Sequence, residues 1–373
     1  MSAPVKIAAC CLLCLVLLSA PFTWAQEGLQ LVHADSLVLL KTDKGSVQRL
    51  YGHVRMVQED AYMRCGRAVF WQVQNRAHFE EDVVIFDGEH TLWADQVDYD
   101  GEAHTERATG NVKIRTGDRL LFANRVMYDQ ETLIARAQGD VRIEDWIQKA
   151  VLTGLFAEFD RSRDTGWIRG EPVLVMVDST ESDTLRIRGE KMEGWGETQR
   201  VQVTDSVRIE KGGLTATSQA ADYWADSSLI VLTAGPFVSQ EQREMTGDTI
   251  RIELAETRFR GGEILGRARV VSSDSTSRNW IAGRRIEIEA DGDTLRKVIV
   301  TRQAESRFFV REEDGGETGL NTVTGDRIEM RFDSNRVSWV QVKSDPGLCT
   351  GRYEPVDPDT VNINPGPNPW PRP

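Results

Sequence analysis

A short phrase that recurs about every 29 residues constrains this 373-residue chain more than any other feature. In this phrase an apolar residue is followed, after one spacer, by a small residue. Two further spacers then lead to a second apolar residue, and one more spacer leads to a third. The phrase is clearest over residues 92–99 and 121–128. A fixed period of about 20 to 50 residues indicates a stacked architecture. The small residue marks ten copies, at Ala34, Cys65, Ala94, Ala123, Gly154, Gly189, Ser218, Gly247, Gly283 and Gly325. The sequence therefore predicts one continuous repetitive domain over residues 26–344.

Apolar and polar residues alternate on both sides of each marker, which is the period of a β-strand. The alternation slips by one residue across the marker, because Leu92 and Ala94 are followed by Val97 and Tyr99. A bulge or bend at the small residue would produce this slip. A second alternating segment, such as residues 110–114, lies between successive markers. We therefore expect an elongated all-β fold of bent antiparallel strands, with about ten repeats of roughly 30 residues.

The two ends of the chain differ from the repeats. Residues 1–25 combine Lys6 with an uncharged run and small residues at Thr23 and Ala25, which predicts a cleaved secretory signal peptide. A retained membrane anchor is the alternative, since this run could just span a bilayer. Residues 345–373 hold eight of the twelve prolines, so we expect a disordered tail there.

Charge and cysteine content exclude two classes of protein. The chain has 45 basic and 58 acidic side chains, a net charge of -13, which repels the phosphate backbone of nucleic acids. Only Cys65 and Cys349 lie beyond residue 25, so no disulfide framework holds the fold together.

No pattern of catalytic or metal-binding residues stands out. The five histidines, at positions 33, 53, 78, 90 and 104, lack metal-ligand spacing, and we expect them on exposed strands or turns. Asp and Glu fall mainly at outward-facing positions, where solvation explains them better than a catalytic carboxylate pair. We predict a protein that is not an enzyme and that needs no metal and no cofactor.

The paired strands resemble a known family. Gly110, Val112 and Ile114 precede Ala123, Val126 and Tyr128, and this order is similar to that of the OstA/LptA group of lipopolysaccharide-transport proteins. The resemblance implies a twisted, V-shaped antiparallel β-jellyroll, open along one side, whose apolar interior shields acyl chains. It also implies that the protein is periplasmic, possibly outer-membrane associated, and that it binds lipopolysaccharide or a related glycolipid and transports it toward the outer membrane.

The inward-facing apolar residues are the predicted lipid-binding site. They are Phe70, Leu92, Val97, Tyr99, Val112, Ile114, Leu121, Val126, Tyr128, Val141, Ile143, Phe159, Tyr223 and Ile250. A closed β-solenoid would place the same residues in a packed core, so a structural or adhesive solenoid without a lipid ligand remains an alternative. A polysaccharide-active β-helix enzyme is a further one. An open trough with an unfilled interior would favour the lipid carrier over both.

The ends of a strand stack predict the partners. A terminal strand exposes unpaired backbone groups, which invite another chain unless charge or proline blocks them. Residues 29–40 form an apolar edge without proline, whereas residues 336–342 precede the proline-rich segment. We therefore expect strand-edge pairing with other envelope lipid-transport components, or head-to-tail self-association.

Overall fold

A computed structural model describes residues 30–58, 61–177, 184–255, 258–273, 277–291, 294–311, 317–333, 336–345 and 348–355. The predicted signal peptide lies outside these residues. Every regular element in the described part is a β-strand, and the described strand pairs are antiparallel. The predicted all-β antiparallel fold is therefore confirmed.

The contacts divide the chain into two compact units where the sequence predicts one continuous domain. The N-terminal unit contains β1 (Gln30–His33), β2 (Ser36–Thr42), β3 (Gly45–Gln58), β4 (Ala61–Trp71), β5 (Arg76–Phe86), β6 (His90–Asp100), β7 (Thr105–Thr116), β8 (Arg119–Asp129), β9 (Ile134–Asp145), β10 (Ala150–Asp160), β11 (Thr165–Arg169), β12 (Val173–Val177) and β14 (Lys191–Trp195). The C-terminal unit contains β16 (Leu214–Trp224), β17 (Leu229–Thr233), β18 (Phe237–Gln240), β19 (Arg243–Thr246), β20 (Thr249–Ala255), β21 (Arg258–Ser273), β22 (Arg278–Asp291), β23 (Thr294–Arg311), β24 (Glu317–Asp333), β25 (Arg336–Lys343) and β26 (Thr350–Pro355). The boundaries between the units fall within β13 (Thr184–Arg188) and β15 (Arg200–Lys211).

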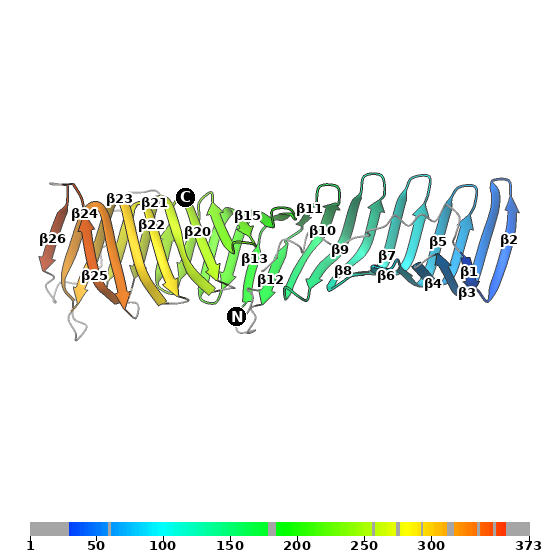
Figure 1. The fold of residues 1–373 in the computed structure, drawn as a ribbon, viewed down its shortest axis with the longest axis horizontal. Coiled ribbons are helices and arrows are strands. Elements are labelled where there is room, and N and C mark those ends of the chain that lie inside the picture. Colours follow the sequence, from blue (N-terminus) through cyan, green and yellow to red (C-terminus); the bar gives the residue numbers. More distant parts are fainter. Residues whose placement is uncertain are drawn as a thin grey trace. The chain divides into compact units, whose positions relative to one another are not determined.

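Strands β3 to β10 follow one another side by side, and each pairs with its neighbours along most of its length (Figure 1). Aspartates close the turns after β6, β8 and β10. Asp129 Oδ1, for example, accepts the backbone N–H groups of Glu131 at 3.0 Å and of Thr132 at 2.9 Å. The bond from Thr132 is the largest cause that lowers the pKa of Asp129 below its usual value. Asp100 and Asp160 repeat the same turn.

Each long strand bends at a corner near its middle. In β7, Gly110 and Asn111 have φ angles of +78° and +45°, whereas β6 places the single residue Asp95 opposite them. The slip in alternation that the sequence predicts at Ala94 is confirmed, but it falls between Asp95 and Gln96, one residue after Ala94. The additional residue of the bulge belongs to β7, not to β6. Asp95 Oδ2 accepts a 2.9 Å hydrogen bond from Asn111 Nδ2 across this corner. Similar pairs of left-handed residues occur at 52–53, 81–82, 139–140, 205–206, 266–267 and 302–303.

The corner divides the N-terminal unit into two walls. The first wall comprises residues 54–58, 61–65, 83–86, 90–94, 112–116, 119–123, 141–145 and 150–154; the second comprises residues 45–51, 67–71, 76–80, 96–100, 105–109, 125–129, 134–138 and 156–160. Leu92 and Ile114 of the first wall line the same hollow as Tyr99 and Val126 of the second. The walls therefore face each other across a shared apolar interior.

Two short strands cover the last long strand at each end. β1 and β2 pair with the two halves of β3, and β25 and β26 pair with the two halves of β24. Residues 350–355 are thus a strand, although the sequence predicts a disordered tail from residue 345. Their backbone pairs with the ladder of β24, and only Pro355 of the eight prolines of residues 345–373 lies in the strand. The remainder of the predicted tail, from residue 356, lies outside the described residues.

The corner glycines should be difficult to replace. A Cβ added to Gly110 would lie 2.2 Å from Asp95 Oδ2, and the φ of +78° disfavours any side chain. We expect Gly110→Ala to lower the free energy of unfolding by about 1 to 3 kcal/mol, measured by denaturant titration. Gly117→Ala is the control, because Gly117 also has a positive φ but no atom within 4 Å of the added Cβ. Equal losses in the two variants would show that contact with Asp95 is irrelevant.

Candidate functional site

The predicted lipid-binding residues face the interiors of the two units. Thirteen of the fourteen are buried, and Phe70 is half-buried. Six of them line one hollow of the N-terminal unit: Leu92, Val97, Tyr99, Ile114, Val126 and Tyr128. The other predicted residues of that unit lie at further inward positions of the same walls. Burying a large apolar side chain contributes about 1.5 to 3 kcal/mol, so these residues also hold the walls together.

The interior of the N-terminal unit is filled by side chains. Ile114, Leu121 and Tyr128 are each at most 2% exposed, and the rings of Phe70 and Phe79 pack edge to face with centroids 5.6 Å apart. The hollow that remains is a narrow apolar slot bounded by both walls. An open, unfilled trough is therefore not observed in this part of the chain. A chain-like ligand could enter only by separating the walls.

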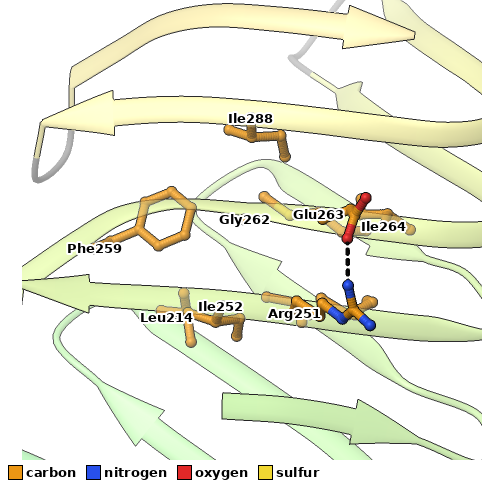
Figure 2. A pocket seen from close by; sticks show the side chains of 11 residues that line it. Leu214, Arg251, Ile252, Phe259, Gly262, Glu263, Ile264 and Ile288 are labelled. Atoms are coloured by element: carbon orange, nitrogen blue, oxygen red, sulfur yellow. Dashed lines mark hydrogen bonds and ion pairs between the residues drawn. The ribbon is translucent and has the colours of Figure 1, made fainter. Parts of the chain in front are cut away.

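The C-terminal unit contains a second apolar hollow. Figure 2 shows Leu214, Phe259 and Ile288 around it, together with the Arg251–Glu263 pair, whose hydrogen bond measures 2.9 Å. Ile250 lines this hollow, as a predicted site residue should, whereas Tyr223 is buried elsewhere in the unit.

A polar row runs along the free end of the first wall, which we call the first lip. His90, Thr116, Arg119 and Asp145 are consecutive partners in the strand register. Arg119 Nε donates to Asp145 Oδ2 at 2.8 Å, and the Asp145 side chain is only 2% exposed. The Thr116 hydroxyl is buried and has no hydrogen-bond partner within the described part of the chain. The apolar interior therefore ends at polar groups that face inward.

A buried histidine–aspartate pair continues the first lip. His90 Nδ1 lies 3.0 Å from Asp87 Oδ2, and both side chains are 6% exposed. Burial raises the pKa of Asp87, but the hydrogen bonds from His90 and Glu89 together lower it below the usual value. The expectation that all five histidines are exposed is wrong for His90, because the inward parity of β6 carries it into the wall interior.

A carboxylate marks the free end of the second wall, the second lip. Glu106 lies between Tyr99 and Tyr128 in the register, and its Oε1 accepts a 2.7 Å hydrogen bond from Gln130. Burial, followed by the charge of Glu106, raises the pKa of Tyr99. The interior is thus apolar at its centre and polar at both lips.

The sequence contained the signal for these lip residues. Period-two alternation continued past Ile114 reaches Thr116, and continued past Ile143 it reaches Asp145. The same step back from Leu121 reaches Arg119. These residues are polar, so a criterion of apolar side chains does not identify them as inward-facing. Glu106 and Asp145 also depart from the expected outward placement of carboxylates.

No cluster of three or more His, Cys, Asp or Glu side chains that could hold a metal ion occurs in the described ranges. No helix in that part of the chain is long and apolar enough to cross a membrane. The arrangement supplies apolar contact and polar lips.

Two family models match the chain. One describes the LptA/(LptD N-terminal domain) LPS transport protein and matches residues 93–258; the other describes an OstA-like protein and matches residues 26–105. No curated protein matches the sequence. A similar solved structure is that of LptH from Pseudomonas aeruginosa, described as the LptA homologous periplasmic component of the conserved lipopolysaccharide transport device. It shares 14% identity at a TM-score of 0.21, over 39% of this chain and 82% of that one.

The matches define the class of protein: the two models describe transport proteins, and the chain is of the lipopolysaccharide-transport type rather than an enzyme. Within that class, the chain belongs to the OstA/LptA family. The resemblance read from the paired strands is therefore confirmed.

The two cysteines of the described residues should react very differently. Cys65 is buried in the first wall, and burial raises the pKa of its thiol to about 12, so almost no thiolate is present at neutral pH. Cys349 is exposed and free. We expect iodoacetamide to modify Cys349 in the folded protein and to reach Cys65 only after denaturation, as measured by peptide mass mapping. Modification of Cys65 at a comparable rate under native conditions would contradict the packed wall.

Proposed function

We propose that this protein binds lipopolysaccharide or a related glycolipid in the periplasm and passes it toward the outer membrane. The observation that carries the proposal is the continuous apolar interior of the N-terminal unit, bounded by polar lips. Membership of the OstA/LptA family supports the same conclusion. Acyl chains would occupy the interior between the walls, and the charged head group would remain outside in water.

The filled interior requires the walls to separate before a lipid can enter. The strand ladders run along each wall from one strand to the next, for instance from β6 to β7 and from β7 to β8. Separating the walls therefore breaks side-chain contacts between them and leaves these ladders intact. An inserted acyl chain restores apolar contact, at about 0.8 kcal/mol for each buried methylene. The exchange can thus be close to balanced in free energy.

Photo-crosslinking can test lipid contact directly. We expect a photoreactive amino acid at Tyr128, which is 2% exposed in the interior, to capture lipopolysaccharide in living cells. The matched control is the adjacent residue Met127, whose register partners Arg107 and Arg136 belong to the outer face of the second wall. Mass analysis of the adducts identifies the lipid. Equal capture at the two positions, or capture at neither, would refute a lipid-binding interior.

The short end strands supply candidate surfaces for partners. Leu37 and Leu39 of β2 are 53% and 55% exposed, although the equivalent residues of inner copies are buried. At the other end, Val337, Trp339 and Val340 of β25 are also exposed. We infer that β1 and β2 of one molecule pair with β25 and β26 of another, or with a transport component of the same fold. This head-to-tail contact uses a different surface on each molecule and does not form a closed ring, so repeated association builds rods.

Charge at the N-terminal edge should block this association. We expect Leu37→Lys/Leu39→Lys to abolish concentration-dependent growth in sedimentation velocity, because two ammonium groups would have to be buried at the joint. Both residues are exposed in the free chain, so the fold should be retained. Ile147→Lys is the control, since Ile147 is 67% exposed in the turn between β9 and β10, several strands from β2. A wild-type chain that stays monomeric at all concentrations would leave only foreign partners for this edge.

A structural or adhesive β-solenoid is the second candidate function, favoured by the filled interior. It predicts no lipid adduct at Tyr128 and no change in stability when lipid is added. The crosslinking experiment therefore distinguishes the two functions.

A further inference from the structure

The outer face of the first wall carries a row of basic and aromatic side chains, which we call the cationic row. Its members are Arg55, Arg64, Trp93, Lys113, Phe122 and Arg142. They occupy one line of register partners from β3 to β9, with Val84 between Arg64 and Trp93. Six strand spacings of about 4.8 Å give the row a length of roughly 29 Å. The line contains no carboxylate.

Most of these cations lack an acidic partner. Arg55 and Arg64 form no ion pair within the part of the chain that the structure describes. The Lys113 ammonium lies between two rings, 5.0 Å from the centroid of Trp93 and 5.8 Å from that of Phe122. Only Arg142 has a carboxylate neighbour, Glu144, at 2.6 Å.

The next row toward the first lip extends the same surface. From β4 to β9 it consists of Tyr62, Phe86, Thr91, Arg115, Leu120, which is buried, and Glu144. The rings of Tyr62 and Phe86 lie 5.4 Å apart, and the Arg115 guanidinium lies 5.9 Å from the ring of Trp146. Trp146 is 53% exposed. The two adjacent rows therefore combine aromatic rings with cations, and Glu144 is the single carboxylate within them.

Several outward charges of the second wall form ion pairs, although Arg107 and Arg125 form none among the described residues. Arg76 pairs with Asp100 at 2.7 Å and Arg136 with Glu158 at 2.7 Å. His78 lies 2.7 Å from Asp98. The cationic row differs from the second wall because three cations that are unpaired within the described ranges, Arg55, Arg64 and Lys113, share one line of register partners with two aromatic rings.

We propose that the cationic row binds an acidic saccharide, a linear chain of phosphorylated or carboxylated sugars. Unpaired guanidinium and ammonium groups attract such anions, and the rings of Trp93 and Phe122 offer flat apolar faces for the sugars. A narrow ligand fits better than an anionic membrane, because the carboxylates of Asp95 and Asp140 border the row at the corner and that of Asp118 borders it at the first lip. At physiological ionic strength, screening over about 8 Å limits repulsion from the rest of the chain.

This inference rests on the proposed function, since it assigns a location to the sugars of the glycolipid. The strands that carry the cationic row end at the first lip, where Arg119 and Asp145 close the interior. A lipid whose acyl chains enter between the walls would leave its head group at this lip. Its acidic sugars could then extend over the outer face of the first wall.

The experiment titrates the full-length protein with polygalacturonate and with phosphorylated dextran by calorimetry, with neutral dextran as a blank. We expect at least one acidic saccharide to bind, and affinity to fall as salt increases. Arg64→Glu/Arg142→Glu should weaken binding at least tenfold, and Trp93→Ala several-fold. Arg107→Glu/Arg125→Glu is the control, because it makes the same charge change at exposed positions of the second wall and should alter affinity less than twofold.

Several results would overturn the inference. These are no binding of either acidic saccharide, equal losses in the two double variants, or equally tight binding of polyglutamate, which carries charge without sugar. Capture of phosphatidylglycerol vesicles through the row without saccharide binding would assign it to a lipid surface instead. Both saccharides lack acyl chains, so the result is independent of lipid capture at Tyr128. Lipid capture without saccharide binding defeats this inference alone, and saccharide binding without lipid capture defeats the proposed function alone.

Discussion

The corner pairing of one residue against two is the constraint on which the rest of this structure depends. At Asp95, a single residue of β6 faces the left-handed pair Gly110 and Asn111 of β7. The extra residue bends both strands without breaking their ladder, because the register resumes on either side. One strand can therefore contribute to two walls. Repetition of the corner along the chain gives two walls that are joined along the corner and enclose an apolar interior.

That construction separates two roles that a packed core normally combines. Backbone hydrogen bonds hold each wall together, whereas apolar side chains hold the walls to each other. A wall can keep its hydrogen bonds while its inner face exchanges one apolar partner for another. Tyr128 and Ile114 are therefore core residues in the closed state and candidate contacts for an acyl chain in an open one. A filled interior is compatible with the proposed transport because apolar contacts between the walls would be replaced by apolar contacts with the acyl chain.

The fold followed from the sequence to a large extent, because the repeat imposes it locally. The parity slip at Ala94 gave the bend, and the alternation gave the inward face. Local patterns do not show where the contacts divide the chain into two units. They also do not show that β24 offers an open ladder to β26, which contains only one of the eight prolines of residues 345–373. In the candidate site, the alternation of the strands predicts that Arg119 and Asp145 face inward. Because both side chains are polar, a criterion of apolar residues does not select them.

Charge placement is the feature that connects the interior to the outside. Among the described residues, the inward positions of the N-terminal unit carry acidic or basic side chains only at the lips, such as His90, Glu106, Arg119 and Asp145. Several outward cations of the second wall are paired with carboxylates, whereas three cations of the cationic row are unpaired in the described part of the chain and share one line with two aromatic rings. An amphiphile in this unit would meet apolar contact inside, hydrogen-bonding groups at the lip and unpaired cations beyond it. The two walls thus differ in their outward charge, and the proposed function together with the inferred saccharide site assigns both parts of a glycolipid to the first wall.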